Sequence, residues 1–173
     1  MTTMLKVGLA ELRQRRRLPI DADVPPDHPI WTGAGITFAT PLAVTGHASL
    51  RDEDVVVRLR LVGEASADCR RCLEPVQLPV DEEIDLVYRP GLTDVEAEAA
   101  EVYPLPERAR EVDLSAAVRE HTLLAVPQYV TCEEECRGLC PRCGAELNQA
   151  ECGCHEEVAD PRWSALRRLS NES

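Results

Sequence analysis

Alternating apolar and polar positions predict strands through the first half of the chain. Residues 36–50 are rich in Thr, Val and Ala and end at a polar turn, residues 51–54. Val55–Leu61 then alternates apolar with charged residues at its latter end, the period-two pattern of a half-buried strand. The two runs predict a β-hairpin.

Two more strands, residues 64–69 and 76–88, are predicted on either side of a second turn. Even spacing in the second of these strands places four apolar residues on one side of it: Val80, Ile84, Leu86 and Tyr88. The expected core is therefore an antiparallel β-meander.

One or two helices are predicted after the strands. Residues 90–106 hold Gly91, three prolines and many acids, so a long exposed loop is expected there. Asp113 is expected to cap a helix that runs to about Ala125. Asp160 followed by proline predicts a second helix start, whose apolar stripe could dock on a neighbouring module or whose arginines could contact a partner.

Length and composition favour a single α+β domain with a small appended module. The chain has 173 residues, which is enough for a real core, and only 3% are aromatic, so Val, Leu, Ala and Ile must fill that core. We predict a β-rich domain over residues 1–128, with the acidic loop and a helix, and a cysteine-rich zinc module with the C-terminal helix over residues 129–173. The sequence also lacks a run of about eighteen apolar residues, so no membrane span is expected and a cytoplasmic location is the simplest expectation.

The cysteines carry the strongest chemical signal. Six of the eight fall within residues 132–154. Cys140-Pro-Arg-Cys143-Gly is a turn that lets two thiolates reach one tetrahedral ion, because proline fixes one φ angle and glycine permits a left-handed backbone after the second ligand. Cys152 and Cys154 could supply the other two ligands of a closed, structural zinc site, with His155 as a substitute for one thiolate.

A second site is predicted from the remaining four cysteines. Cys69 and Cys72 form another C-x-x-C, and 59 residues separate them from Cys132. Pairing them with Cys132 and Cys136 would create a second four-thiolate site that joins distant parts of the chain, so one or two zinc ions are expected. A redox pair and plain structural cysteines remain alternatives for Cys69 and Cys72, as do disulfides or reduced thiols for the C-terminal cluster.

Charge is unevenly distributed along the chain. The net charge is −12, which opposes binding of a polyanion through the whole surface and makes a basic protein the more natural partner. Residues 1–20 carry five basic side chains against one acidic, whereas residues 81–113 carry eleven acidic against three basic. Both runs could be solvated surface. As contacts for RNA or a partner the candidates are Arg13, Arg15, Arg16, Arg17, Arg70, Arg71, Arg162, Arg167 and Arg168.

Several segments together resemble one known family. They are Lys6-Val-Gly-Leu-Ala-Glu-Leu, Cys69-Arg-Arg-Cys72-Leu-Glu-Pro, the acidic tract followed by Asp113-Leu-Ser, Cys136-Arg-Gly-Leu-Cys140-Pro-Arg-Cys143-Gly-Ala-Glu-Leu-Asn and Asp160-Pro-Arg. In these the chain is similar to the YceD family, the large ribosomal RNA subunit accumulation proteins. The resemblance implies a role in 23S rRNA accumulation and large-subunit assembly. Some members of that family retain only the central C-x-x-C.

Three functions follow as hypotheses. The first is a non-enzymatic assembly factor that binds large-subunit rRNA or a basic ribosomal protein. The second is a redox-sensing zinc protein whose thiols regulate partner binding. The third, an enzyme acting on RNA, is disfavoured because a closed four-cysteine site cannot activate water and no catalytic constellation is evident in the sequence.

Overall fold

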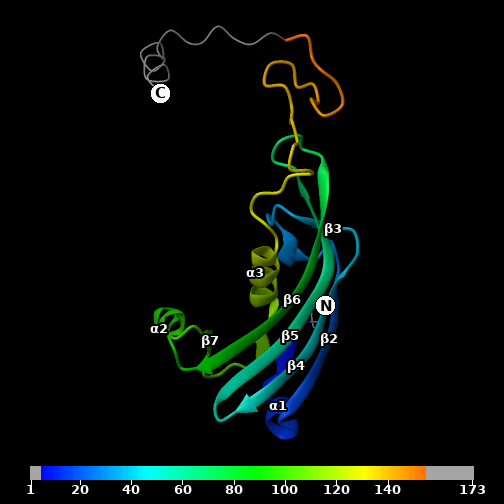
Figure 1. Cartoon of the computed structure of the whole chain (residues 1–173). Coiled ribbons are helices and arrows are strands. Elements are labelled where there is room, and N and C mark those ends of the chain that lie inside the picture. Colours follow the sequence, from blue (N-terminus) through cyan, green and yellow to red (C-terminus); the bar gives the residue numbers. More distant parts are fainter. Residues whose placement is uncertain (1–4, 155–173) are drawn as a thin grey trace, which may run out of the picture.

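The structure is a computed structural model that describes residues 5–154. Its centre is a curved sheet in which β2, β4, β5, β6 and β7 are neighbours in that order, with β3 paired to β5 (Figure 1). The strands are β2 (Arg17–Val24), β3 (Thr37–Phe38), β4 (Leu42–Arg51), β5 (Asp54–Asp68), β6 (Pro75–Pro90) and β7 (Tyr103–Leu105).

The hairpin of β5 and β6 runs most of the length of the molecule (Figure 1). β5 has 15 residues and β6 has 16, and they pair without interruption from Val55 opposite Tyr88 to Asp68 opposite Pro75. The two predicted runs 55–61 and 64–69 therefore form one strand. The turn at the far end of this hairpin carries Cys69 and Cys72, so pairing alone projects these thiols away from the main core.

The predicted pairing and facing of the central strands are confirmed. β4 and β5 form the expected hairpin, with Arg51 opposite Asp54 across the turn. On β6 the four residues of even spacing are all buried: Val80, Ile84, Leu86 and Tyr88. The main core is mostly aliphatic, as the composition requires, with a Trp31–Phe38 ring contact at 4.6 Å.

Helix α3 (Ser115–Ala125) covers one face of the sheet (Figure 1). Its buried residues include Ala117 and Val118, and Arg119 donates to the carbonyl of Ile30, next to the short 3-10 helix η1 (Pro29–Trp31). The N-cap of α3 is Leu114, which makes no side-chain cap, so the predicted cap is one residue off. Asp113, the residue before it, accepts from the backbone N–H of Ser115 at 2.9 Å.

The sequence patterns predict no helix or strand in the N-terminal region, yet the structure has both there. Strand β1 (Lys6–Gly8) pairs with β8 (Glu111–Asp113), and α1 (Leu9–Arg15) follows directly. Arg16 ends this helix in a left-handed conformation, φ 64°, with its N–H donating to the carbonyl of Leu12. Residues 5–154 thus contain three α-helices, α1, α2 and α3, of which the sequence predicted only α3.

The prediction of one long loop over residues 90–106 was wrong. The segment contains α2 (Asp94–Ala99) and β7, which pairs parallel to β6, so the sheet is not a purely antiparallel meander. Thr93 and Glu96 form a capping box that starts α2. Tyr103 stacks on Tyr88 with ring centroids 5.2 Å apart, which holds β7 at the sheet. Local capping and this aromatic contact outweigh the disfavouring acids and prolines.

Candidate metal centres

Four thiols converge where the β5–β6 hairpin turns. The Sγ atoms of Cys69, Cys72, Cys132 and Cys136, the proximal tetrad, all lie within 4.8 Å of one another. The sulfurs of Cys69 and Cys136 are 3.8 Å apart, and those of Cys72 and Cys132 are 3.5 Å apart. Cys132 is exposed and the other three are buried.

Backbone hydrogen bonds position the first pair of thiols, those of Cys69 and Cys72. The N–H of Cys69 donates to the carbonyl of Glu74 at 2.8 Å and continues the hairpin into the turn. The N–H of Arg71 points at the sulfur of Cys69, 3.4 Å away. The N–H of Arg70 donates to the carbonyl of Val130 at 2.8 Å, so the segment that supplies the second pair is already attached to the hairpin. The two cysteine pairs are therefore brought together by backbone contacts as well as by any bonds that their sulfurs make.

A second set of four thiols lies further along the chain. The Sγ atoms of Cys140, Cys143, Cys152 and Cys154, the distal tetrad, also lie within 4.8 Å of one another. The N–H of Gly144 donates to the carbonyl of Cys140 at 2.9 Å. Gly144 has φ +73°, which confirms the left-handed backbone predicted after the second cysteine of this turn.

The two C-x-x-C turns share one conformation although their sequences differ. The residue after Cys72 is Leu73, and it adopts φ 64°, close to the value of Gly144 after Cys143. A left-handed conformation costs a residue with a side chain roughly 1–2 kcal/mol. The hydrogen bond from the N–H of Leu73 to the carbonyl of Cys69, at 2.9 Å, helps to hold it in this conformation.

The two tetrads are joined by hydrogen bonds that the cysteine spacing did not reveal. The side-chain amide of Asn148 lies 3.3 Å from the sulfur of Cys136 and can donate to it, and its oxygen accepts from the N–H of Arg137 at 2.6 Å. Asn148 stands between the second and third cysteines of the distal tetrad in sequence, so one side chain connects both centres. Only the folded arrangement could show this role, because the sequence has no signal for it.

Close backbone packing also connects the two cysteine segments. The guanidinium of Arg71 donates to the carbonyl of Cys136 at 2.8 Å, and the carbonyl of Arg71 accepts from Leu139 at 3.0 Å. Gly138, at φ +72°, lies so close that an added Cβ would be 2.8 Å from the carbonyl oxygen of Arg71. A glycine is therefore required at this crossing.

The thiols of the proximal tetrad differ sharply in acidity. Backbone N–H groups, that of Cys72 foremost, lower the pKa of Cys69 to about 6. The hydrogen bond with Cys136 and then burial raise the pKa of Cys132 to about 12. Cys69 is therefore the thiol that ionises readily, while Cys132 retains its proton at neutral pH.

The distal tetrad repeats this contrast. The backbone N–H of Cys143 is the main cause that lowers the pKa of Cys140 to about 6, and the hydrogen bond with Cys143 raises the pKa of Cys154 to about 12. Four neighbouring thiols cannot all ionise by themselves, because each new negative charge opposes the next. A bound cation would supply the compensating charge and displace the last protons.

Both tetrads fit a metal ion of tetrahedral preference. A regular tetrahedron with a metal–sulfur distance of about 2.3 Å places its sulfurs about 3.8 Å apart, which is the Cys69–Cys136 separation. The sulfurs are far beyond the roughly 2.05 Å of a disulfide bond. The structure thus groups the eight cysteines as the spacing predicted, and each group could hold a metal; the ligand role and the identity of the ion remain predictions.

The arginines predicted as rRNA or partner contacts lie in different places. Arg13 lines a cleft beside α1, Arg15 lies 3.4 Å from Glu11, Arg16 ends α1 and Arg17 begins β2. All four are exposed. Their contact role stays a prediction.

The other predicted contact residues lie near or beyond the tetrads. The guanidinium of Arg70 lies over the exposed ring of Tyr129, 5.3 Å from its centroid, while Arg71 is bound to backbone carbonyls. Arg162, Arg167, Arg168 and the predicted C-terminal helix lie outside the described residues, as does His155.

The acidic stretch 81–113 is partly neutralised by its neighbours. Asp81 pairs with Arg60 at 2.8 Å and Asp85 with Arg58 at 3.0 Å, both across the β5–β6 pairing. The remaining acids are spread over β6, α2, β8 and the segments between them. In residues 5–154 none of the helices is long and apolar enough to cross a membrane.

Comparison with known proteins supports a single family. Residues 57–170 match the family model described as "Large ribosomal RNA subunit accumulation protein YceD". An uncharacterized protein of Mycobacterium tuberculosis is 32% identical over 116 residues, which are 66% of this chain and 55% of that protein. The chain therefore spans about half the length of the mycobacterial relatives it matches.

Two further relatives extend the comparison to other organisms. The "Large ribosomal RNA subunit accumulation protein YCED homolog 1, chloroplastic" of Arabidopsis thaliana is 31% identical over 67 residues, 39% of this chain and 21% of the plant protein. The uncharacterized protein YlbN of Bacillus subtilis is 26% identical over 131 residues, 75% of this chain and 74% of the relative. No solved structure matches the chain.

Proposed function

Since this chain belongs to the YceD family of large ribosomal RNA subunit accumulation proteins, we propose that it is a non-enzymatic factor that supports 23S rRNA accumulation and large-subunit assembly. The observation that carries the proposal is the extent of the family match. It begins in β5 and continues to residue 170, and so includes both C-x-x-C turns. The family name supplies the link to large-subunit RNA, and the absence of catalysis is part of the proposal.

Zn²⁺ is the ion that we propose for both tetrads. It accepts four thiolates in tetrahedral geometry, and in such closed sites it serves structure. The residues that would hold it are those of the proximal tetrad, which attach residues 130–136 to the hairpin turn, and those of the distal tetrad, which close the following segment on itself. The amide of Asn148 and the N–H of Arg71 would stabilise the bound thiolates.

The partner in this proposal is large-subunit rRNA or a basic ribosomal protein, met in the cytoplasm where the subunit assembles. A net charge of −12 favours the basic protein, while the scattered arginines are the features that could contact RNA. Salt separates the two modes, because contact with several phosphates weakens steeply as salt rises.

Depletion and co-sedimentation test the proposed function. Cells depleted of the protein should lose mature 23S rRNA relative to 16S rRNA, and the wild-type gene should restore the ratio. A tagged protein should sediment with precursors of the large subunit in sucrose gradients. An unchanged rRNA ratio together with absence from every precursor fraction would contradict the proposal.

Exposed thiols favour one second candidate, a redox sensor. Cys132, Cys143 and Cys154 are exposed, so an oxidant such as hydrogen peroxide could reach each tetrad. Two thiolates would then form a disulfide, their two electrons would reduce the peroxide to two waters with two protons taken up, and the ion would be released. Binding to precursors that persists after complete oxidation of the thiols would exclude this candidate.

A further inference from the structure

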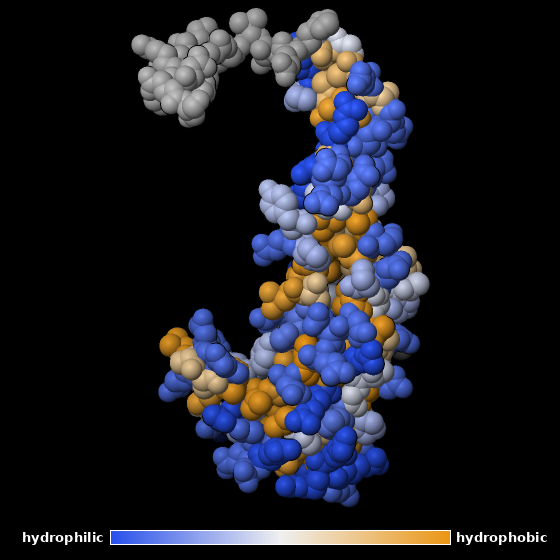
Figure 2. Space-filling view, viewed as in Figure 1, coloured by the Kyte–Doolittle hydropathy of each residue, from blue (hydrophilic) through white to orange (hydrophobic). Residues whose placement is uncertain are grey.

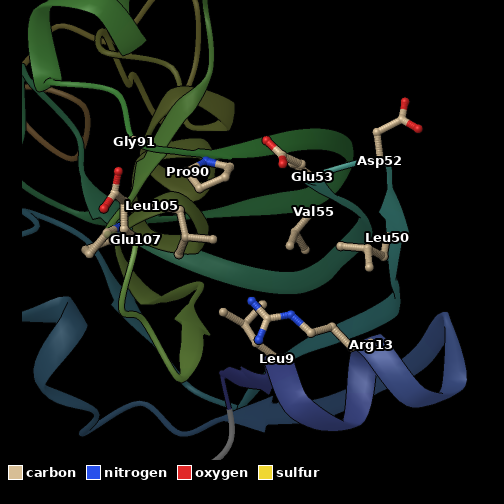
Figure 3. Close-up of a pocket in the computed structure, with 11 residues that line it drawn as sticks. Leu9, Arg13, Leu50, Asp52, Glu53, Val55, Pro90, Gly91, Leu105 and Glu107 are labelled. Carbon is tan, nitrogen blue, oxygen red and sulfur yellow. The ribbon is translucent and has the colours of Figure 1, made fainter.

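A cleft of about 440 Å³ lies at the end of the sheet opposite to the tetrads. Four segments that are distant in sequence form it: α1, the turn between β4 and β5, the end of β6, and β7 with the residues after it (Figure 3). We name it the N-terminal cleft. Its volume falls within the roughly 300–1,000 Å³ of ordinary ligand pockets.

The floor of the N-terminal cleft is apolar. Leu9, Val55 and Leu105 line it, and each is buried in the main core. Because these side chains are held by the core, the floor is preformed. Such a surface suits an aliphatic group several carbons long.

The rim of the cleft is acidic. Glu53 and Glu107 are exposed and lie on the side of Pro90 and Gly91 in Figure 3, with Asp52 further out on the β4–β5 turn. Among the described residues no ion pair involves these three carboxylates. The nearby cation Arg89 is already held by Asp54 at 2.7 Å, so it does not neutralise the rim.

One cation of the chain reaches into the same cleft. Arg13 extends from α1 on the side opposite to Glu53 and Glu107 (Figure 3). It forms no ion pair with the rim in the part of the chain that the structure describes. Its charge therefore repels any other cation that approaches the floor, without satisfying the carboxylates.

We propose that the N-terminal cleft binds an Arg or Lys side chain of a basic protein partner. The aliphatic stem lies against Leu9, Val55 and Leu105, and the cationic head lies between Glu53 and Glu107. The inference rests on the proposed function and narrows its partner to a basic protein, since an acidic rim on a chain of net charge −12 repels phosphate. Apolar floor and charged rim are both needed, because exposed carboxylates alone discriminate weakly.

Binding of a defined peptide tests this. The probe is a fluorescein-labelled hexapeptide of alternating Arg and Leu, titrated by fluorescence anisotropy in about 50 mM salt, where screening is weaker than in the cell. Removing two rim charges in Glu53→Gln/Glu107→Gln should weaken binding about five-fold. Arg13→Gln should strengthen it about two-fold, because the competing charge is gone.

A matched control separates the cleft from the overall charge. Glu64→Gln/Glu98→Gln removes two exposed carboxylates outside the cleft and should leave peptide binding unchanged. All the variants change exposed side chains, and a wild-type circular-dichroism spectrum checks their folding. Equal weakening by the control pair, or weaker binding of the peptide to Arg13→Gln, would overturn the proposal.

A single-stranded RNA oligonucleotide is titrated in parallel. If the wild type binds this RNA and Arg13→Gln weakens that binding, the proposal of a cleft for a basic side chain is overturned in favour of an RNA-binding surface on α1. The gradient experiment remains a separate readout. If Glu53→Gln/Glu107→Gln binds the peptide as tightly as the wild type does, while the wild type still sediments with precursors, only the cleft proposal is rejected. If the wild type does not sediment with precursors, the proposed function is rejected.

Discussion

At Leu73 the first C-x-x-C turn places a leucine in a backbone conformation that the second turn gives to a glycine. The side chain is 62% exposed, so it gains little from burial in return for the left-handed φ of 64°. Glycine carries no Cβ penalty in this region. The two turns thus differ in intrinsic strain although both bring two thiols together.

Leu73→Gly should raise the free energy of unfolding by about 1 kcal/mol, because it removes this strain. Chemical denaturation of the zinc-loaded protein measures the change. Leu73→Ala is the matched control, since it shortens the side chain but retains the Cβ, and it should not stabilise. Equal stabilisation by both variants would attribute the effect to the exposed leucine side chain and not to the backbone.

Asn148 offers a test of the connection between the two tetrads. Asn148→Ala removes the N–H that points at Cys136 and should weaken zinc at the proximal tetrad about ten-fold, because outer hydrogen bonds tune thiolate ligands. Transfer of zinc to a chromophoric chelator measures the affinity. Asn148→Asp keeps the acceptor for Arg137 but adds a negative charge, so it should weaken zinc further. Wild-type affinity in both variants would show that Asn148 has no role in binding the ion.

At the scale of elements, period-two alternation succeeded where strands are long and central. It also runs through β2, whose residues Leu18, Ile20, Ala22 and Val24 are all buried. Pro19 and the two aspartates of this strand disfavour a strand by propensity, and they are tolerated because β2 lies at the edge of the sheet. Helix α1 has only seven residues and two buried leucines, too short a pattern to recognise.

Helix α2 depends on its cap to an unusual degree, because it has only six residues. Thr93→Ala removes the side-chain acceptor for the N–H of Glu96 and should cost about 1 kcal/mol of local stability. Hydrogen exchange at the amides of residues 96–100 should therefore become about five-fold faster. Thr93→Ser retains the hydroxyl and should exchange as the wild type does. Unchanged exchange in Thr93→Ala would show that β7 and the Tyr88–Tyr103 stack hold α2 without the cap.

At the scale of the whole molecule, the cysteines and the main core are separate packing units. Cys69, Cys72 and Cys136 form their own buried cluster, with Val76 packed against it, apart from the large aliphatic core. Figure 2 shows the narrow end of the molecule that carries the tetrads. If the tetrads hold the proposed Zn²⁺, much of the stability at that end should come from its bonds to sulfur.

Removal of metal should therefore loosen one end and leave the other folded. The native protein should contain about two equivalents of zinc, each supplying of order 10 kcal/mol of apparent binding free energy. After chelation, trypsin should cut rapidly after Arg137 and Arg142, while the β4–β6 core should persist. Limited proteolysis followed by mass spectrometry measures this.

The variant Cys140→Ser is the control for that experiment. It disables the distal tetrad only, so it should retain about one equivalent of zinc at the proximal tetrad. Equal resistance of metal-free and zinc-loaded protein to trypsin would contradict a structural role for the ion.

The sequence by itself determined the local features: the left-handed backbone at Gly144, the even-spaced core residues of β6, and the start of α3 close to Asp113. These depend on a few neighbouring residues, so spacing and residue type suffice to predict them. It also divided the cysteines correctly into two groups, through counting and ligand spacing.

Only the tertiary structure decided which distant groups meet. The continuous β5–β6 pairing carries Cys69 to the segment of Cys136, and the packing of α1 places Arg13 in the same cleft as Glu107. Asn148 and Gly138 gained their roles in the same way. Such contacts follow from strand length, register and packing summed over the whole chain, and no local pattern encodes that sum.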